Sequence, residues 1–297
     1  MEQQARTLQP GQRSQLFTYD LATGASTLVA ESDSVLFEAP NWTPDGDWLI
    51  VNGDGLLQRV RVSGGELEPI VVPGLPLLNN DHVLSPDGSS AYVSGFDGQL
   101  HQVDLAARTS RQVSNDRGPA FIHFLHGVSP DGTLLAYIGM DLLADGGVRT
   151  NIYTVPTAGG ADMQLTDSAA PHDGCEFSPD GEWLYFNSER GSDLPGHAQL
   201  FRMRLDGSGI EQLTHDERVN WFPHISPDGT KVVYISFPAT TLGHPADLDV
   251  IIRLLGADGI GTDLVQLFGG QGTINVPSWS PDSTRFAYVA YPLLREA

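Results

Sequence analysis

Six copies of one four-residue turn sequence constrain the fold of this chain more than any other feature. Each copy lies between two runs of apolar, β-branched or aromatic residues, a pattern that predicts strand, tight turn and strand. Successive copies begin 42 to 54 residues apart, which is close to the period of about 40 to 45 residues of a four-stranded propeller blade. Six copies therefore predict six blades. The copies are Thr43-Pro-Asp-Gly, Ser85-Pro-Asp-Gly, Ser129-Pro-Asp-Gly, Ser178-Pro-Asp-Gly, Ser226-Pro-Asp-Gly and Ser280-Pro-Asp-Ser.

The residue types in these turns have separate physical roles. Proline presets φ near about −65° early in the turn, and the aspartate side chain accepts a hydrogen bond from a backbone N–H two residues on. The closing glycine adopts a positive φ without steric cost. We therefore interpret the six turn aspartates as structural.

The remaining strands indicate how the ring closes. After each turn hairpin a third strand ends near Asp-Gly or Gly-Gly, and a fourth ends in a sequence such as Gln-Leu-Thr. The last copy has only its first two strands, 276–279 and 285–291, whereas residues 15–30 form a third and fourth strand with no first or second. We therefore predict an all-β fold, a six-bladed β-propeller of four-stranded antiparallel blades. Residues 1–297 form this single domain, and the strands in 15–30 complete the last blade, which removes open sheet edges.

Composition excludes several kinds of partner. The chain has 37 acidic and 16 basic residues and a net charge of −21 at pH 7, which opposes binding to nucleic acid or to anionic lipid. No stretch approaches the roughly 18 apolar residues of a membrane span, and residues 1–13 lack the pattern of a signal peptide. We expect a cytoplasmic monomer without membrane insertion. Cys175 is the one cysteine, so an internal disulfide is impossible.

The repeats resemble a known family. The turn hairpin, the Asp-Gly turn and the Gln-Leu-Thr strand are similar to the repeat of TolB-like β-propellers, and the resemblance covers nearly the whole chain. The segments 220–229, 243–254 and 268–283 resemble a group of single-domain bacterial TolB-like proteins of unestablished activity. The resemblance implies a binding role. TolB itself has a further domain, and the related peptidases have an α/β-hydrolase domain, but no Gly-x-Ser-x-Gly elbow occurs here.

Topology predicts which face carries the function. In an antiparallel meander the loops between second and third strands share one face with the loops between blades, and we call this the top face. The longest second-to-third loops are expected at 140–150, 189–198 and 237–249. Long loops on one face are typical of a binding surface.

Histidines and other polar residues concentrate at this face. Most histidines precede or begin an innermost strand or lie in the long loops, and the innermost strands line the channel. Convergent polar groups above a channel predict a ligand site. The candidate residues are Asp81, His82, His126, His172, Asp173, Glu176, Glu189, Arg190, Asn220, Trp221, His224, His244 and Asn275.

Several roles for these residues remain open. His126, His172 and His224 come from adjacent blades and are candidate ligands for a divalent metal ion, with Glu176 as a fourth ligand or base. The alternatives are hydrogen bonds that stiffen loops and acid–base work without metal. Glu189 with Asp173 or Glu176 is a candidate glycosidase pair. Trp221 either stacks on a sugar or packs inside the protein.

The sequence thus predicts a propeller that binds a small molecule, with carbohydrate as one class, or a protein partner through its top face. No catalysis is implied by any motif. The alternative is a carbohydrate-active lyase or hydrolase that uses the histidines and carboxylates, with or without a divalent metal.

Overall fold

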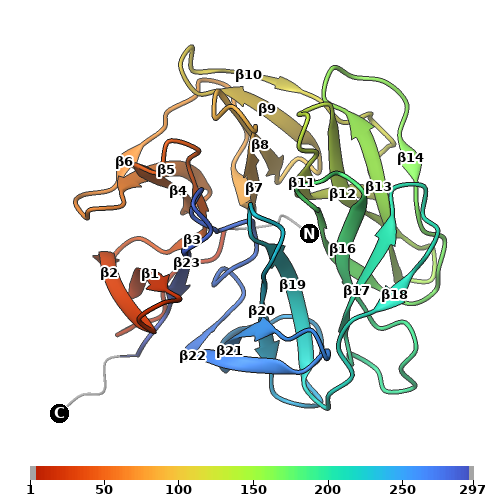
Figure 1. Cartoon of the computed structure of the whole chain (residues 1–297). Coiled ribbons are helices and arrows are strands. Elements are labelled where there is room, and N and C mark those ends of the chain that lie inside the picture. The colour runs from red at the N-terminus through yellow and green to blue at the C-terminus, as the bar shows by residue number, and fades with distance from the viewer. Residues whose placement is uncertain (1–4, 294–297) are drawn as a thin grey trace.

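In the computed structural model, which describes residues 5–293, six antiparallel β-sheets form a closed ring around a central channel (Figure 1). No helix occurs in the described residues. The ring confirms the predicted all-β, six-bladed propeller.

Five blades are complete four-stranded sheets, whose strands run in chain order from the channel to the rim. Blade one contains β3 (Phe37–Trp42), β4 (Trp48–Gly53), β5 (Leu56–Arg61) and β6 (Glu68–Pro69). Blade two contains β7 (Leu78–Leu84), β8 (Ser90–Gly95), β9 (Leu100–Asp104) and β10 (Thr109–Gln112). Blade three contains β11 (Phe121–Val128), β12 (Leu134–Leu142), β13 (Val148–Pro156) and β14 (Met163–Gln164).

The next two blades follow the same plan. Blade four contains β15 (His172–Phe177), β16 (Trp183–Ser188), β17 (Gln199–Arg204) and β18 (Glu211–Gln212). Blade five contains β19 (Val219–Ile225), β20 (Val232–Phe237), β21 (Ala246–Leu255) and β22 (Gly261–Gly270).

The sixth blade joins the two ends of the sequence. β23 (Arg285–Ala290) pairs with β1 (Ser14–Asp20), which pairs with β2 (Ala25–Ser32). The register between β1 and β23 extends from Gln15↔Ala290 to Asp20↔Arg285, so the predicted closure by N-terminal strands is confirmed. The innermost segment, 276–279, has one bridge, Trp279↔Phe286, and is not a regular strand. Pro277 lies in it and has no N–H to donate to a ladder.

The turn sequences form the same hydrogen bonds in each blade. In blade five the Ser226 hydroxyl donates to Asp228 Oδ1 at 2.6 Å and accepts from the N–H of Lys231 at 3.0 Å. Asp228 Oδ1 also accepts from the N–H of Thr230 at 3.0 Å. These bonds hold the pKa of Asp228 well below its usual value. They confirm the structural role of the turn aspartates.

One expected long loop is shorter in the structure. β12 and β13 pair as far as Leu142↔Val148, so residues 140–150 are mostly strand and the loop is 143–147. The expected loop at 189–198 is present, and the loop expected at 237–249 is confined to 238–245, because Ala246 begins β21.

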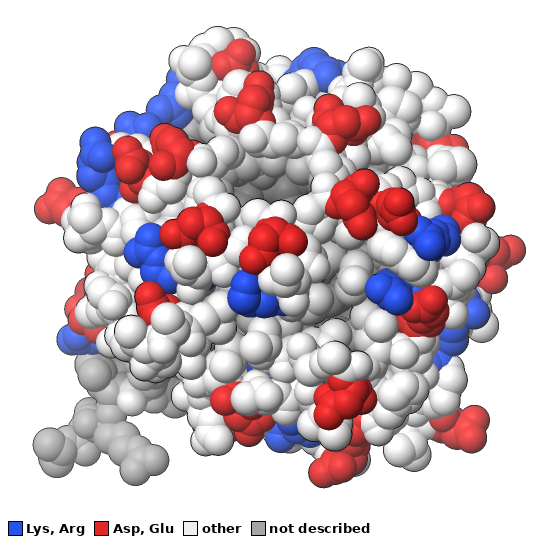
Figure 2. All heavy atoms as spheres, viewed as in Figure 1, with Lys and Arg blue, Asp and Glu red and all other residues white. Residues whose placement is uncertain are grey.

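Charged side chains are spread over the face of the molecule that Figure 2 shows. Figure 2 shows acidic side chains spread over the visible face, with basic side chains between them and a hollow toward the top of the view. Within residues 5–293 there is no apolar helix of the length that a membrane span requires.

Candidate functional site

Irregular strand pairing shapes the top mouth of the channel. The innermost strands of blades one to five all contain a register shift, between Glu38 and Asn41, Leu78 and His82, Leu125 and Gly127, Asp173 and Glu176, and Trp221 and His224. Such a bulge bends the strand and turns side chains that regular alternation would place elsewhere. The residues that these segments contribute to the mouth lie three to six positions before the turn sequences.

Gly174 allows the innermost strand of blade four to bend. Its φ is +62°, in the left-handed region that favours glycine. A Cβ atom at this position would lie 2.6 Å from Asn187 Oδ1 and 2.9 Å from the ring of Phe222. Asn187 Oδ1 accepts the backbone N–H of Phe222 at 3.1 Å, so this contact also joins blades four and five. Gly174 thus permits the bend that positions Asp173.

The mouth contains a cavity of about 310 Å³. Residues from blades two to six line it, and they combine an apolar wall with amide, carboxylate and imidazole groups. They are Asn79, Asn80, Asp81, Phe96, Phe124, His126, Ile138, Met140, Thr150, Asp173, Phe222, His244, Gln271 and Asn275.

An ion pair forms the polar centre of this cavity. His126 Nε2 lies 2.8 Å from Asp173 Oδ1, and His244 Nε2 lies 3.5 Å from Asp173 Oδ2. Burial alone would lower the pKa of His126, but the carboxylates of Asp173 and Asp81 outweigh burial and raise it to about 9. Burial opposes ionisation of Asp173 as well, yet the two histidines hold its pKa well below its usual value. The pair is therefore ionised at neutral pH.

Asp81 has a different environment from Asp173. Its Oδ2 accepts a hydrogen bond from Asn79 Nδ2 at 2.7 Å, and its backbone N–H donates to Asn79 Oδ1 at 2.9 Å. Burial raises the pKa of Asp81, and the charge of His126 only partly opposes this effect. Asp81 is therefore a buried carboxyl group whose direct side-chain partner is an amide.

Amides and aromatic rings hold His244 in place. His244 Nδ1 donates to Gln271 Oε1, which also accepts from Asn275 Nδ2 at 3.2 Å. The ring of His244 packs 4.5 Å from the ring of Trp221 and 5.1 Å from that of Phe222, measured between centroids. Trp221 is buried behind His244. Of its two predicted roles, stacking on a sugar and packing inside the protein, this position matches packing.

Three predicted histidines lie outside the cavity. His82 is buried with its ring nitrogens 3.2 and 3.4 Å from the carbonyl oxygens of Asn80 and Ile50, and burial lowers its pKa to about 4. His172 packs edge-on against Phe186 at 5.6 Å, with neither ring nitrogen hydrogen-bonded, and burial with the nearby Arg190 charge lowers its pKa to about 4.

The third histidine, His224, bridges two neighbouring segments. Its Nδ1 lies 2.6 Å from Glu176 Oε2 and its Nε2 lies 2.6 Å from the carbonyl oxygen of Ile274. His126, His172 and His224 thus have separate partners. Among residues 5–293 no group of three His, Cys, Asp or Glu side chains is arranged to hold a metal ion, so the predicted three-histidine metal centre is not formed.

The carboxylates of the predicted glycosidase pair have different contacts. Glu189 Oε2 accepts the N–H of Gly196 at 2.8 Å within the 189–198 loop. Glu176 faces a second cavity of about 350 Å³, lower in the channel, and accepts the N–H of Ile225 at 3.0 Å. Arg190 donates its backbone N–H to Ser188 and does not line the upper cavity. Neither Glu189 nor Glu176 lines the upper cavity with Asp173.

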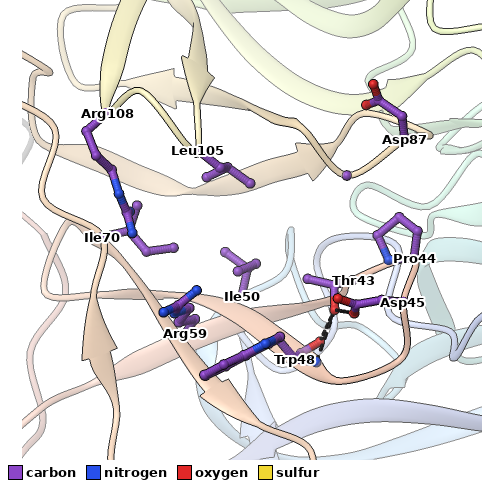
Figure 3. Close-up of a pocket in the computed structure, with 11 residues that line it drawn as sticks. Thr43, Pro44, Asp45, Trp48, Ile50, Arg59, Ile70, Asp87, Leu105 and Arg108 are labelled. Atoms are coloured by element: carbon purple, nitrogen blue, oxygen red, sulfur yellow. Dashed lines mark hydrogen bonds between the residues drawn. The ribbon is translucent and has the colours of Figure 1, made fainter.

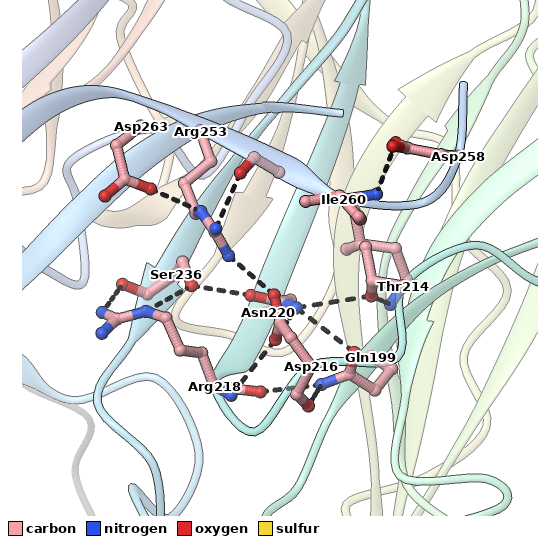
Figure 4. A network of polar contacts seen from close by, with 12 residues as sticks. Gln199, Thr214, Asp216, Arg218, Asn220, Ser236, Arg253, Asp258, Ile260 and Asp263 are labelled. Carbon is pink, nitrogen blue, oxygen red and sulfur yellow. Dashed lines mark hydrogen bonds and ion pairs between the residues drawn. The ribbon is translucent and has the colours of Figure 1, made fainter. Parts of the chain in front are cut away.

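Asn220 belongs to a polar network between blades four and five (Figure 4). Its Nδ2 donates to Asp216 Oδ1 at 3.0 Å, and its Oδ1 accepts from the Ser236 hydroxyl at 2.7 Å. Asp216 also pairs with Arg253 Nη1 at 2.7 Å. Asn220 therefore holds two blades together and does not face the cavity.

A further cavity of about 250 Å³ lies between blades one and two (Figure 3). Arg59 lies there with its Cζ 4.2 Å from the centroid of Trp48, and its Nε donates to Glu68 at 2.9 Å. Blade four repeats this arrangement, with Arg202 lying 4.1 Å from Trp183 and donating to Glu211 at 2.8 Å. The repetition indicates a structural stack rather than a site.

Sequence reasoning placed Asp81, His126, Asp173, His244 and Asn275 at the mouth, and all five line the cavity. It missed the aromatic wall of Phe96, Phe124 and Phe222 and the amides of Asn79, Asn80 and Gln271. The available signal was glycine or proline inside an innermost strand, as in Gly174 and Pro223, because these residues mark bulges.

Comparisons with known proteins agree with the propeller fold. A family model described as the TolB beta propeller domain matches residues 76–244. The uncharacterized protein Atu1656 of Agrobacterium fabrum is 39% identical over 286 residues, which are 94% of this chain and 92% of that protein. A solved structure from Agrobacterium tumefaciens, described as a candidate TolB, has a TM-score of 0.86 and 37% identity and covers 95% of this chain and 99% of its own.

A more distant solved structure shares the fold alone. Oligogalacturonate lyase from Vibrio parahaemolyticus has a TM-score of 0.58 and 14% identity, over 94% of this chain and 77% of that chain.

Proposed function

The chain belongs to the TolB β-propeller family, and from this premise we propose that it is a binding protein that holds a small molecule in the cavity at the top mouth. One observation carries the proposal: polar groups from five blades converge on a single cavity of about 310 Å³ that also has an apolar wall. Cavities of roughly 300 to 1,000 Å³ with this mixture are typical of small-molecule sites.

The enzyme alternative receives less support. The carboxylates that it requires, Glu189 and Glu176, lie outside the cavity that contains Asp173. The lyase with the same fold is only 14% identical, and a shared fold does not transfer an activity. Binding without catalysis needs only the groups that line the cavity.

The test is thermal unfolding of the protein with a panel of amines, acidic sugars, amino sugars and neutral sugars. A ligand at 100 times its Kd adds about 2.7 kcal/mol, which raises the Tm of a chain of this length by about 4 °C. Met140 lines the cavity and is partly buried, so Met140→Trp fills it. Met163 is 51% exposed on β14, so Met163→Trp is the matched control.

The expected result is a selective rise in Tm that is lost in Met140→Trp and kept in Met163→Trp. A rise that survives in Met140→Trp places the ligand elsewhere and refutes the proposal. The absence of any rise with the whole panel also refutes it.

A further inference from the structure

Resting on the proposed function, we infer that the ligand carries a cationic amino group on an apolar body, with the amino group held by Asp81 and the body by Phe96, Phe124 and Phe222. The inference names a chemical class, an organic amine. This class follows from the charged groups of the cavity, because some of them already have a partner of opposite charge and one does not.

Asp81 is the carboxylate in this cavity without a cation partner. Asp173 has two imidazoles, with His126 at 2.8 Å and His244 at 3.5 Å. Asp81 has the amide of Asn79 at 2.7 Å, and among residues 5–293 no Lys, Arg or His nitrogen lies within 4.0 Å of it. The charges of His126 and Asp173 offset each other, so His126 does not also compensate the charge of an ionised Asp81 in full.

A buried carboxylate without a counter-ion is unstable relative to its protonated form, because burial removes water from the charge. A ligand ammonium would replace the lost solvation by an ion pair and a charge-assisted hydrogen bond. Binding of the amine and ionisation of Asp81 are therefore linked. The cation that pairs with Asp81 is therefore supplied by the ligand.

The apolar residues of the cavity suit the rest of such a ligand. Phe96, Phe124 and Phe222, with Ile138 and Met140, line the same cavity. Aromatic faces attract cations and also pack against apolar groups. An aromatic amine would thus satisfy both sides of the cavity at once.

The charge of the cavity disfavours an anionic ligand. No Lys or Arg occurs among its lining residues, whereas Asp81 and Asp173 both do. The net charge of −21 on the chain also repels anions at long range.

The test uses three compounds that share a phenyl ring and a two-carbon chain and differ in the end group: phenethylamine, phenethyl alcohol and phenylacetate. Calorimetric titration at about pH 7.5 is expected to show phenethylamine binding at least about tenfold more tightly than the alcohol, a ratio that corresponds to about 1.4 kcal/mol. Phenylacetate is expected to bind more weakly than the alcohol. Asp81→Asn, which preserves shape, should remove the preference for the amine. Asp33→Asn, at an exposed aspartate between β2 and β3, should keep it.

A pH titration of the unaltered protein tests the same inference if Asp81→Asn does not fold. Affinity for phenethylamine should fall as pH is lowered, because Asp81, whose pKa burial raises, takes up a proton while the amine stays charged. The groups that act on Asp81 electrostatically are His126, Asp173, His244 and Glu38. Burial raises the pKa of Glu38 to about 7, so the titration is repeated in Glu38→Gln, where the fall should persist.

Equal binding of the amine and the alcohol, or an amine preference that Asp81→Asn retains, overturns the inference. If an acidic or neutral sugar raises the Tm in a Met140-sensitive way while phenethylamine does not bind, the amine class is wrong and the binding function stands. If no compound binds in a Met140-sensitive way, both are refuted.

Discussion

His126→Asn removes the cation of the buried pair at the mouth of the channel. His126 is 4% exposed and its Nε2 lies 2.8 Å from Asp173 Oδ1. A pKa that rises from 6.5 to about 9 on folding corresponds to about 3 kcal/mol of stability, since each pKa unit is worth about 1.4 kcal/mol. The lowered pKa of Asp173 reports the same interaction, so it adds nothing further.

The sign of the pH effect follows from linkage. The folded protein binds the His126 proton more tightly than the unfolded chain does, so the stabilisation is complete below about pH 6.5 and is lost as pH rises through about 9. Relative to His126→Asn, the unaltered protein should therefore lose about 3 kcal/mol of unfolding free energy between about pH 6.5 and 9.5. Subtracting the variant removes the contribution of the titrating groups that do not interact with His126.

The assay is urea unfolding of four proteins at both pH values: the unaltered chain, His126→Asn, Asp173→Asn and the double variant. At about pH 6.5 each single variant should lose about 3 kcal/mol, the low end for a broken buried pair, because 21% of the Asp173 side chain is exposed to the cavity. The double variant should lose less than the sum of the two. Parallel pH curves for the unaltered protein and His126→Asn would refute the reasoning.

Three further changes test the parts that support the site, each by urea unfolding. Gly174→Ala should cost about 2 kcal/mol or more, because a positive φ is strained for alanine and the new Cβ meets Asn187 Oδ1; an unchanged midpoint would contradict the assigned role of Gly174. Leu16→Ala, at a fully buried position of β1, should cost about 2 to 5 kcal/mol, whereas Leu28→Ala, 49% exposed on β2, should cost no more than about 0.5 kcal/mol. Ser226→Ala should cost about 1 kcal/mol through the lost turn bonds, and a loss no larger than that of Leu28→Ala would show the turn to be rigid without its hydroxyl.

The fold was predictable because its signals are local and repeated. The turn at Ser226 makes its hydrogen bonds within six residues, so its residue types alone predict it. Closure by residues 15–30 followed from counting strands in the last blade. The irregularity of segment 276–279 was not predictable from its apolar residues. Pro277 limits strand pairing, whereas its neighbours still resemble a strand.

The cavity was predictable only in part because bulges break the two-residue alternation of strands. His82 and His224 precede the turn sequences as expected, yet the register shifts in β7 and β19 place them against backbone carbonyls. Phe222 enters the cavity through a φ of +51°, a conformation that its residue type does not indicate. Phe124 and Phe222 lie in innermost strands, where apolar residues are more simply interpreted as core, and this is why these two rings were missed.

The pairing of β1 with β23 has a consequence for synthesis of the chain. Tyr288 of β23 and Ser26 of β2 are joined by a hydrogen bond across 262 residues. At translation rates of about 5 to 20 residues per second, β23, the strand that completes their sheet, is synthesised about 13 to 50 s after β1 and β2. Throughout that interval the ring is open and its N-terminal strands are available to another nascent chain. The period in which two chains can exchange these strands is therefore governed by ribosome speed and not by the stability of the finished ring.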